Sequence, residues 1–172
     1  MLFIPLQLNA MDLSLTEYKL KAALIYRLIM FVDWPEQAQQ TVTGSFGICV
    51  LGDDPFGTAL DALQQRKARQ YAIKIYRYSQ SDSITNECQV VFISASKQAF
   101  QATILRVLKK FPILTIGETE DFAQQGGMIQ FATGEKRINF IINPVSAEAV
   151  GLKIASPLLD LSTVIDTGFR TE

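Results

Sequence analysis

Five carboxylate side chains follow two of the apolar segments that we expect to form parallel strands: Asp53, Asp54, Glu118, Glu120 and Asp121. The carboxyl ends of parallel strands meet at one edge of a sheet, where α/β proteins bind their ligands. Carboxylate oxygens are suitable ligands for divalent cations. These residues could therefore form the binding site of a small-ligand or metal-binding sensor. Alternatively, they cap helices and keep this edge of the sheet soluble, and we favour that explanation.

Two serines, Ser94 and Ser96, follow a third apolar segment, where a nucleophile could lie. The chain contains no histidine, so no Ser-His or Cys-His pair can form, and the commonest metal ligand is missing. No G-x-S-x-G motif surrounds the serines. We therefore expect Ser96 to cap a helix, and we expect no enzymatic activity, no cofactor and no bound metal.

Cys49 and Cys88 are the two cysteines of the chain. Cys49 falls within one expected strand and Cys88 just before another, so neighbouring strands could bring them within bonding range. In an exported protein we favour a disulfide, whereas in a cytosolic protein they would be two small buried hydrophobic residues.

Composition indicates one globular domain. The chain has 172 residues, of which 48% are hydrophobic and 19% charged, with a formal net charge of −1. That charge does not favour nucleic acid or an anionic membrane as a partner. We interpret residues 1–10 as the remnant of an export signal, with a plain apolar N-terminus as the alternative. Residues 11–166 are expected to form the domain and residues 167–172 a tail.

The central element is an apolar strand over residues 46–51, because a strand without polar side chains is buried on both faces. Asp54 then suits a helix N-cap and Pro55 a first helical position, for a helix over residues 55–65. The pattern predicts an α/β fold, a three-layer α/β/α sandwich with a mixed sheet of about six strands. Four strands are predicted to be parallel, in the spatial order 2-1-3-4 when numbered along the chain: residues 46–51, 71–78 (edge-like), 89–94 and 112–117. A C-terminal antiparallel hairpin of residues 128–133 and 137–143 completes the sheet.

Helices are predicted over residues 15–32, 96–111 and 120–125. Two more are predicted near the C-terminus, one from Pro144 to about Gly151 with Asn143 as its N-cap, and a short one over residues 156–161 with Pro157 in its first turn. The first begins at a capping box formed by Ser14 and Glu17. It is apolar around most of its circumference, with a narrow polar stripe through Lys19, Lys21 and Arg27, which is typical of a helix that is packed on several sides or lies at an interface. Near its end, Trp34 is either a ligand or partner anchor or, more often for such a residue, a plug for the core. On the helix over 96–111 we expect an inward-facing apolar side: Phe100, Ile104, Leu105, Val107 and Leu108.

An ordered set of segments resembles the YfiR-like family over about residues 18–165. The segments are LKAA (20–23), FVDWP (31–35), CVLGDDPFG (49–57), CQVVFIS (88–94), FAQQGGMI (122–129), RINFIIN (137–143), GLKI (151–154) and LL (158–159).

The resemblance implies a periplasmic α/β protein without catalytic activity. The founding members of the family repress a membrane-bound diguanylate cyclase by binding its periplasmic region, and an outer-membrane lipoprotein can sequester them. Cys49 and Cys88 lie at positions that look like a disulfide pair of that family, whereas a further C-terminal cysteine pair of some members is absent. We therefore expect a non-enzymatic regulator of cyclic-di-GMP signalling that acts by protein–protein contact and forms a homodimer.

Overall fold

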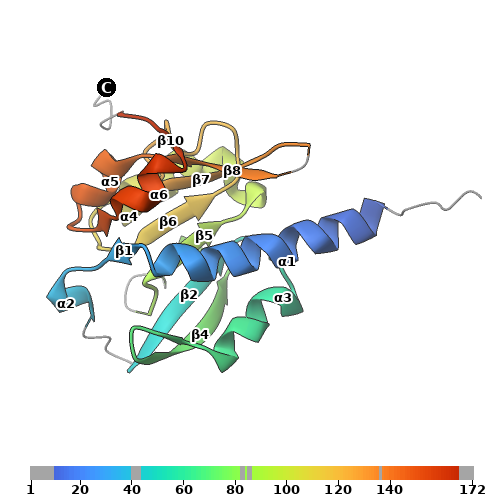
Figure 1. Ribbon diagram of the computed structural model, residues 1–172, viewed down its shortest axis with the longest axis horizontal. Helices are drawn as coiled ribbons and strands as arrows, with labels where there is room; N and C mark the ends of the chain where they lie inside the picture. The colour runs from blue at the N-terminus through green and yellow to red at the C-terminus, as the bar shows by residue number, and fades with distance from the viewer. Residues whose placement is uncertain (1–9, 40–43, 82–83, 85–86, 136, 167–172) are drawn as a thin grey trace, which may run out of the picture.

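The computed structural model describes residues 10–39, 44–81, 84, 87–135 and 137–166, which form a mixed α/β fold (Figure 1). The expected C-terminal tail and all but the last residue of the expected export-signal remnant lie outside these residues. The helices are α1 (Ala10–Ile29), α2 (Glu36–Gln39), α3 (Thr58–Asp61), α4 (Gln101–Leu108), α5 (Pro144–Glu148) and α6 (Ser156–Asp160), with the 3-10 helices η1 (Ala62–Gln65) and η3 (Ala95–Phe100). The strands are β1 (Val32–Asp33), β2 (Ser45–Leu51), β3 (Lys67–Ala68), β4 (Tyr71–Tyr78), β5 (Val90–Ile93), β6 (Leu114–Gly117), β7 (Ile129–Thr133), β8 (Ile138–Ile142), β9 (Lys153–Ile154) and β10 (Thr163–Val164).

The main sheet has eight strands in the order β10-β8-β7-β6-β5-β2-β4-β3. Its parallel part, β4-β2-β5-β6, confirms the predicted order 2-1-3-4. The antiparallel hairpin β7–β8 is also confirmed, and β7 joins the sheet by pairing parallel to β6. The sheet exceeds the expected six strands because two-residue strands, β3 and β10, pair with β4 and β8. Such short segments carry no alternation that a sequence pattern could reveal.

Helices cover both faces of the sheet, in agreement with the predicted layers. Along β2, Phe46, Ile48 and Val50 pack in one core cluster together with Ile25 of α1. Cys49 and Leu51 point to the opposite face, in a second cluster with the apolar side of α4. Successive side chains of a strand alternate between the faces, so the apolar β2 supplies both clusters. Figure 1 shows α1 crossing the first face, with its N-terminal end projecting beyond the sheet.

The first helix begins earlier than predicted. Ser14 lies inside α1, and Glu17 forms an ion pair with Lys21 one turn later, so the predicted capping box is wrong. The helix ends at Ile29, and residues after it form β1, which pairs antiparallel with β9. None of the described helices has the length and hydropathy that a membrane span requires.

The region after β2 folds as a turn before its helix begins. α3 starts at Thr58, and Gly57, which has a positive φ of 53°, occupies the N-cap position. Asp54 instead accepts a hydrogen bond from the backbone N–H of Phe56, two residues along, which defines an Asx turn. The prediction of a helix from residue 55 capped by Asp54 is therefore wrong at its start, because Asp side chains favour turns as much as caps.

The helix predicted over residues 96–111 is divided into η3 and α4. Ile104, Leu105 and Leu108 are buried as expected, but Phe100 and Val107 are exposed at 64% and 41%. The 3-10 segment rotates the side chains that precede α4, which shifts Phe100 away from the core.

No helix forms over residues 120–125, where the chain makes a series of turns. The Phe122 ring is fully buried there, between Gly117 and Gly127. A Cβ atom on either glycine would lie 2.3 Å or less from the ring. Tertiary packing of one aromatic side chain thus overrides the local helical preference.

The C-terminal helices follow the prediction more closely. The Asn143 side chain accepts a hydrogen bond from the N–H of Ser146, and Pro144 opens α5, which confirms this cap. α5 ends at Glu148, before the expected end near Gly151. Pro157 lies in the first turn of α6 as expected.

Candidate functional site

The predicted acidic edge does not assemble into one site. Asp54 binds Arg77, with 2.7 Å between Oδ2 and Nε, whereas Glu118 binds Lys21 on a different element. Asp53 and Asp121 are exposed. Among the described residues, no group of three or more His, Cys, Asp and Glu side chains could hold a metal ion. The expectation that these carboxylates gather in one site is therefore wrong, since Asp54 and Glu118 form ion pairs with different basic side chains, Arg77 and Lys21.

The two serines have structural roles in the loops beside this edge. Ser94, not Ser96, is the N-cap residue of η3, because its Oγ accepts a hydrogen bond from the N–H of Ser96. Ser96 Oγ accepts a hydrogen bond of 2.9 Å from the N–H of Asp53, so it connects the turn after β2 to the turn after β5. The prediction that Ser96 caps this helix is therefore wrong, because the cap is Ser94, two residues earlier.

Cys49 and Cys88 are bonded to each other in the structure, with Cα atoms 5.8 Å apart and a χ3 angle of −93°. Both residues are buried, at 0% and 3% exposure. The bond ties the middle of β2 to the residues that lead into β5. Gln89 reinforces the same junction, because its Oε1 accepts a hydrogen bond of 2.6 Å from the N–H of Gly47.

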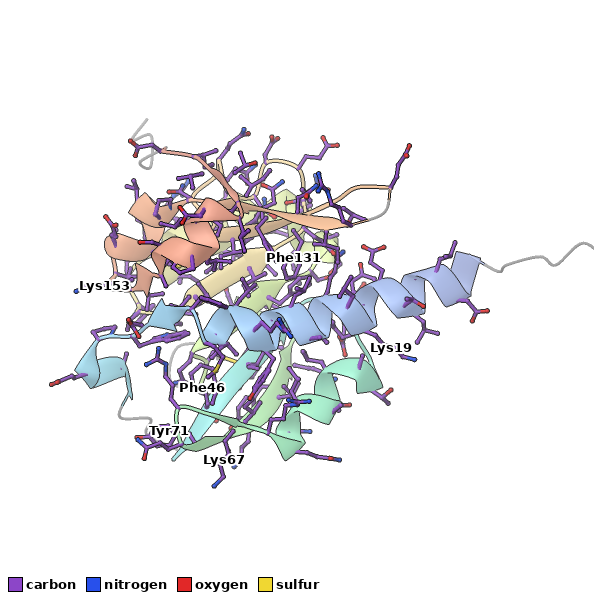
Figure 2. The ribbon with its side chains drawn as sticks, viewed as in Figure 1. Lys19, Phe46, Lys67, Tyr71, Phe131 and Lys153 are labelled. Carbon is purple, nitrogen blue, oxygen red and sulfur yellow. A yellow bond between two sulfur atoms is a disulfide. The ribbon has the colours of Figure 1, made fainter. Side chains whose placement is uncertain are left out.

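Trp34 lies in the core, with an exposed fraction of 4%. Its ring meets that of Phe46 edge to face, with centroids 5.4 Å apart, and the guanidinium of Arg69 lies 5.3 Å from its centroid. Trp34 therefore closes the end of the core and is not a solvent-facing anchor. Figure 2 labels Phe46, a residue of β2, beside α1.

A buried charged cluster, which the sequence analysis missed, lies beneath α1. Lys21 is 2% exposed, and its Nζ lies 2.5 Å from Glu17 Oε1 and 2.6 Å from Glu118 Oε2. The Tyr18 hydroxyl donates a hydrogen bond of 3.0 Å to Glu118, and Thr133 donates one of 3.1 Å to Glu17. Lys21 was assigned to the polar stripe of the helix, which is wrong. Its spacing from Ile25 and Leu28, four and seven residues away, could have placed it on the buried side.

The charges in this cluster shift two pKa values in opposite directions. The hydrogen bond from Lys21 lowers the pKa of Glu17, and burial opposes this change only in part. Burial raises the pKa of Tyr18, and the negative charge of Glu118 raises it further. Both shifts favour a charged Glu17 and a neutral Tyr18 at neutral pH, so the cluster holds α1 on the sheet as an ion-paired contact.

Large apolar side chains lie on the solvent side of α1, on what we call the outer face: Leu13, Leu20 and Phe31. Their exposed fractions are 59%, 48% and 40%. The spacing of seven residues between Leu13 and Leu20 corresponds to about two helical turns, which puts both on one side of α1, and Phe31 lies in the turn that follows the helix. The predicted interface character of this helix thus has a physical basis, because exposed apolar side chains arranged on one face indicate a contact surface.

Comparison with known proteins identifies the family. The family model for YfiR/HmsC-like proteins matches residues 18–163. A search of curated proteins found no match. A solved structure, that of a conserved domain protein from Vibrio cholerae O1 biovar El Tor strain N16961, is similar at a TM-score of 0.57 and 13% sequence identity. The similarity covers 76% of this chain and 58% of that chain, and it supports the fold alone.

The family is known in general for periplasmic regulators of diguanylate cyclase signalling, which act with partner proteins and have no catalytic activity. The matched residues include α1 from Tyr18 onward, the whole parallel sheet, the β7–β8 hairpin and both cysteines. With most of its length matched by the family model, this chain belongs to the YfiR/HmsC-like family.

Proposed function

We propose that this protein is a periplasmic repressor that binds the periplasmic region of a membrane-bound diguanylate cyclase and thereby lowers cyclic-di-GMP. An outer-membrane lipoprotein could release the cyclase by sequestering the repressor. The observation that carries the proposal is the outer face of α1, in a chain whose family acts through partner proteins.

The outer face suits an apolar surface of a partner. Leu13, Leu20 and Phe31 stay in water when the domain is alone, and burying each of them against a partner is worth roughly 1 to 2 kcal/mol before the costs of association. The charged cluster around Lys21 holds a neighbouring side of the same helix on the sheet. The partner would therefore meet a rigid surface and would not need to order a loose segment.

Gene deletion tests the function directly. A repressor that stabilises an inactive state of its cyclase can only lower the activity, so deletion should raise cyclic-di-GMP and matrix production. The measurement is the nucleotide level in a host that expresses the membrane-bound cyclase. An unchanged level would exclude the cyclase as the partner.

Complementation tests the surface. Leu20→Glu should fail to restore a low nucleotide level, because it places a charge in the proposed contact. Val107→Glu is a matched control, since Val107 is also exposed, at 41%, but lies on α4. Thermal unfolding of both purified variants should resemble that of wild type. Equal repression by both variants would show that the outer face does not bind the cyclase.

Location tests the periplasmic part of the proposal. Fractionation of the full-length native gene product should place it in the periplasm, with its N-terminal segment removed. Recovery from the cytosol with an intact N-terminus would contradict export.

A further inference from the structure

The segment that contains η3 and α4, on the face of the sheet opposite α1, is basic. Residues 88–117 contain four basic residues, Lys97, Arg106, Lys109 and Lys110, and neither Asp nor Glu. This segment has a formal charge of +4, whereas the whole chain has −1, so the other residues together carry −5. The small net charge of the chain hides this separation. A basic face on an otherwise acidic protein attracts an anionic partner that the rest of the surface repels.

Helix geometry directs two of these basic side chains away from the sheet. The side of α4 that packs in the core is defined by its buried residues: Gln101, Ile104, Leu105 and Leu108. At 3.6 residues per turn, the opposite side of the helix carries Thr103, Arg106 and, just past the last turn, Lys110. All three are exposed. Among the described residues, no carboxylate forms an ion pair with Arg106 or Lys110, so both charges are available to a partner.

Phe100 adds an apolar side chain to this basic face. It lies at the junction of η3 and α4 and is 64% exposed. Lys110 follows it by ten residues, about 15 Å along a helix, which is too wide a span for one small anion. An exposed aromatic ring together with basic side chains is typical of surfaces that bind anionic membranes. There the ring enters the boundary of the acyl chains and the cations meet lipid phosphates, so a lipid surface supplies both contacts at once.

We propose that η3 and α4 form a membrane-binding face that attaches the protein to anionic phospholipids, with Phe100 at the boundary of the acyl chains and Arg106 and Lys110 at the lipid phosphates. This inference goes beyond the proposed function and does not depend on the cyclase. Because α1 lies on the other side of the sheet, a molecule attached through α4 keeps the outer face free for a protein partner.

Binding of the full chain to phospholipid vesicles tests the inference. In co-sedimentation at low salt, wild type should bind vesicles that contain phosphatidylglycerol, and should bind pure phosphatidylcholine vesicles much more weakly. Arg106→Gln/Lys110→Gln should weaken binding to the anionic vesicles by roughly tenfold or more, because each basic residue near such a surface contributes about fivefold. Raising the salt from about 0.1 M to about 1 M should also release the protein, since the Debye length falls from about 10 Å to about 3 Å.

Lys19→Gln/Arg27→Gln is the matched control. It removes the same number of charges, but from α1, so it should bind the anionic vesicles like wild type. All four substituted positions are exposed, and circular dichroism should therefore show native folding for both double variants.

Fluorescence tests the position of the ring. Trp34 is the single tryptophan of the chain and is buried, so Phe100→Trp adds a second, exposed reporter. Its emission should shift to shorter wavelength when anionic vesicles are added, because the ring leaves water, whereas wild type should show no shift.

Absence of binding to phosphatidylglycerol vesicles would overturn the inference and would leave an acidic protein surface as the partner of this face. Equal losses in the two double variants would also overturn it, because binding would then follow net charge and not α4. An unshifted emission of Phe100→Trp on bound vesicles would contradict the contact of the ring. A protein that lowers cyclic-di-GMP without binding vesicles contradicts this inference alone, and one that binds vesicles without effect on the cyclase contradicts the repressor function alone.

Discussion

The Nζ atom of Lys21 lies 2.6 Å from a carboxylate oxygen of Glu118, and this ion pair joins α1 to the end of β6 across 97 positions of the chain. Lys21 is almost completely buried, and Glu118 has only 11% of its side chain exposed. The outer face of α1 is a neighbouring side of the same helix, because the side chains of the consecutive residues Leu20 and Lys21 point about 100° apart. The ion pair therefore fixes the position of the surface that we propose for partner binding.

Breaking this pair on one side should be costly. Lys21→Met leaves Glu118 and Glu17 without their cation, and we expect the free energy of unfolding to fall by about 3 kcal/mol. The measurement is urea denaturation. Lys19→Met, at an exposed position on the same helix, should change it by less than about 0.5 kcal/mol. In the double variant Lys21→Met/Glu118→Leu, much of the loss should be recovered, because no buried charge of the pair remains unpaired. Equal stability of Lys21→Met and Lys19→Met would contradict the role assigned to the cluster.

Acid should weaken the same contact. The pKa of Glu17 is lowered below its usual value of 4.5, mainly by the hydrogen bond from Lys21. A lowered pKa in the folded state means that the stabilisation is complete above pH 4.5 and is lost as the pH falls through the folded-state pKa. The melting temperature should therefore fall more steeply below that pH in wild type than in Glu17→Gln. Parallel curves for the two proteins would show that Glu17 does not contribute.

The disulfide should provide much of the stability in protein from an oxidising compartment. It closes a loop with a sequence separation of 39 residues, for which chain entropy assigns about 4 kcal/mol as an upper figure. Cys88→Ala should lower the melting temperature, and a reductant should lower that of wild type without affecting the variant. Thiol titration of unreduced, denatured protein gives the direct measurement. Two free thiols per chain in periplasmic protein would show that the bond does not form there.

The neighbouring residues Asp53 and Asp54 should differ in their contribution to the free energy of unfolding. Asp54 binds both the N–H of Phe56 and the side chain of Arg77, whereas Asp53 is exposed. Asp54→Ala should lower the free energy of unfolding by about 1 to 2 kcal/mol, and Asp53→Ala by less than about 0.5 kcal/mol. Neither change should alter cyclic-di-GMP levels at a temperature where the variant is folded. Loss of signalling in Asp53→Ala at unchanged melting temperature would instead support a ligand site at this edge.

Packing around Phe122 should tolerate no added methyl group. A Cβ atom at residue 127 would lie 2.1 Å from the ring, so Gly127→Ala should cost about 1 to 3 kcal/mol in denaturant unfolding. Gly134→Ala is a milder comparison, since its Cβ would lie 3.3 Å from the nearest atom. The second change Phe122→Leu should restore part of the stability lost in Gly127→Ala. Additive losses in the double variant would argue against the close approach.

The sequence by itself determined the six longer strands of the main sheet and its layers, but not the two-residue strands β3 and β10. Apolar strands such as β2 have one stable solution, burial on both faces, and the chirality of crossovers limits the order of the parallel strands. The Asn143 cap and the β7–β8 hairpin were also predictable, because local hydrogen bonds and turn residues define them. The family could be identified from an ordered set of short segments, and the family model matches the same part of the chain.

Only the tertiary structure decided which polar side chains meet. Asp54 and Glu118 follow strands of one sheet, yet Asp54 binds Arg77 of the neighbouring strand β4, whereas Glu118 binds Lys21 of the helix α1. The pairing of Lys21 with Glu118 depends on how α1 lies on the sheet, because the two residues come from distant segments of the chain. The turns around Phe122 likewise depend on two glycines that fold onto one ring. Such contacts join residues far apart in the chain, and no local pattern encodes their geometry.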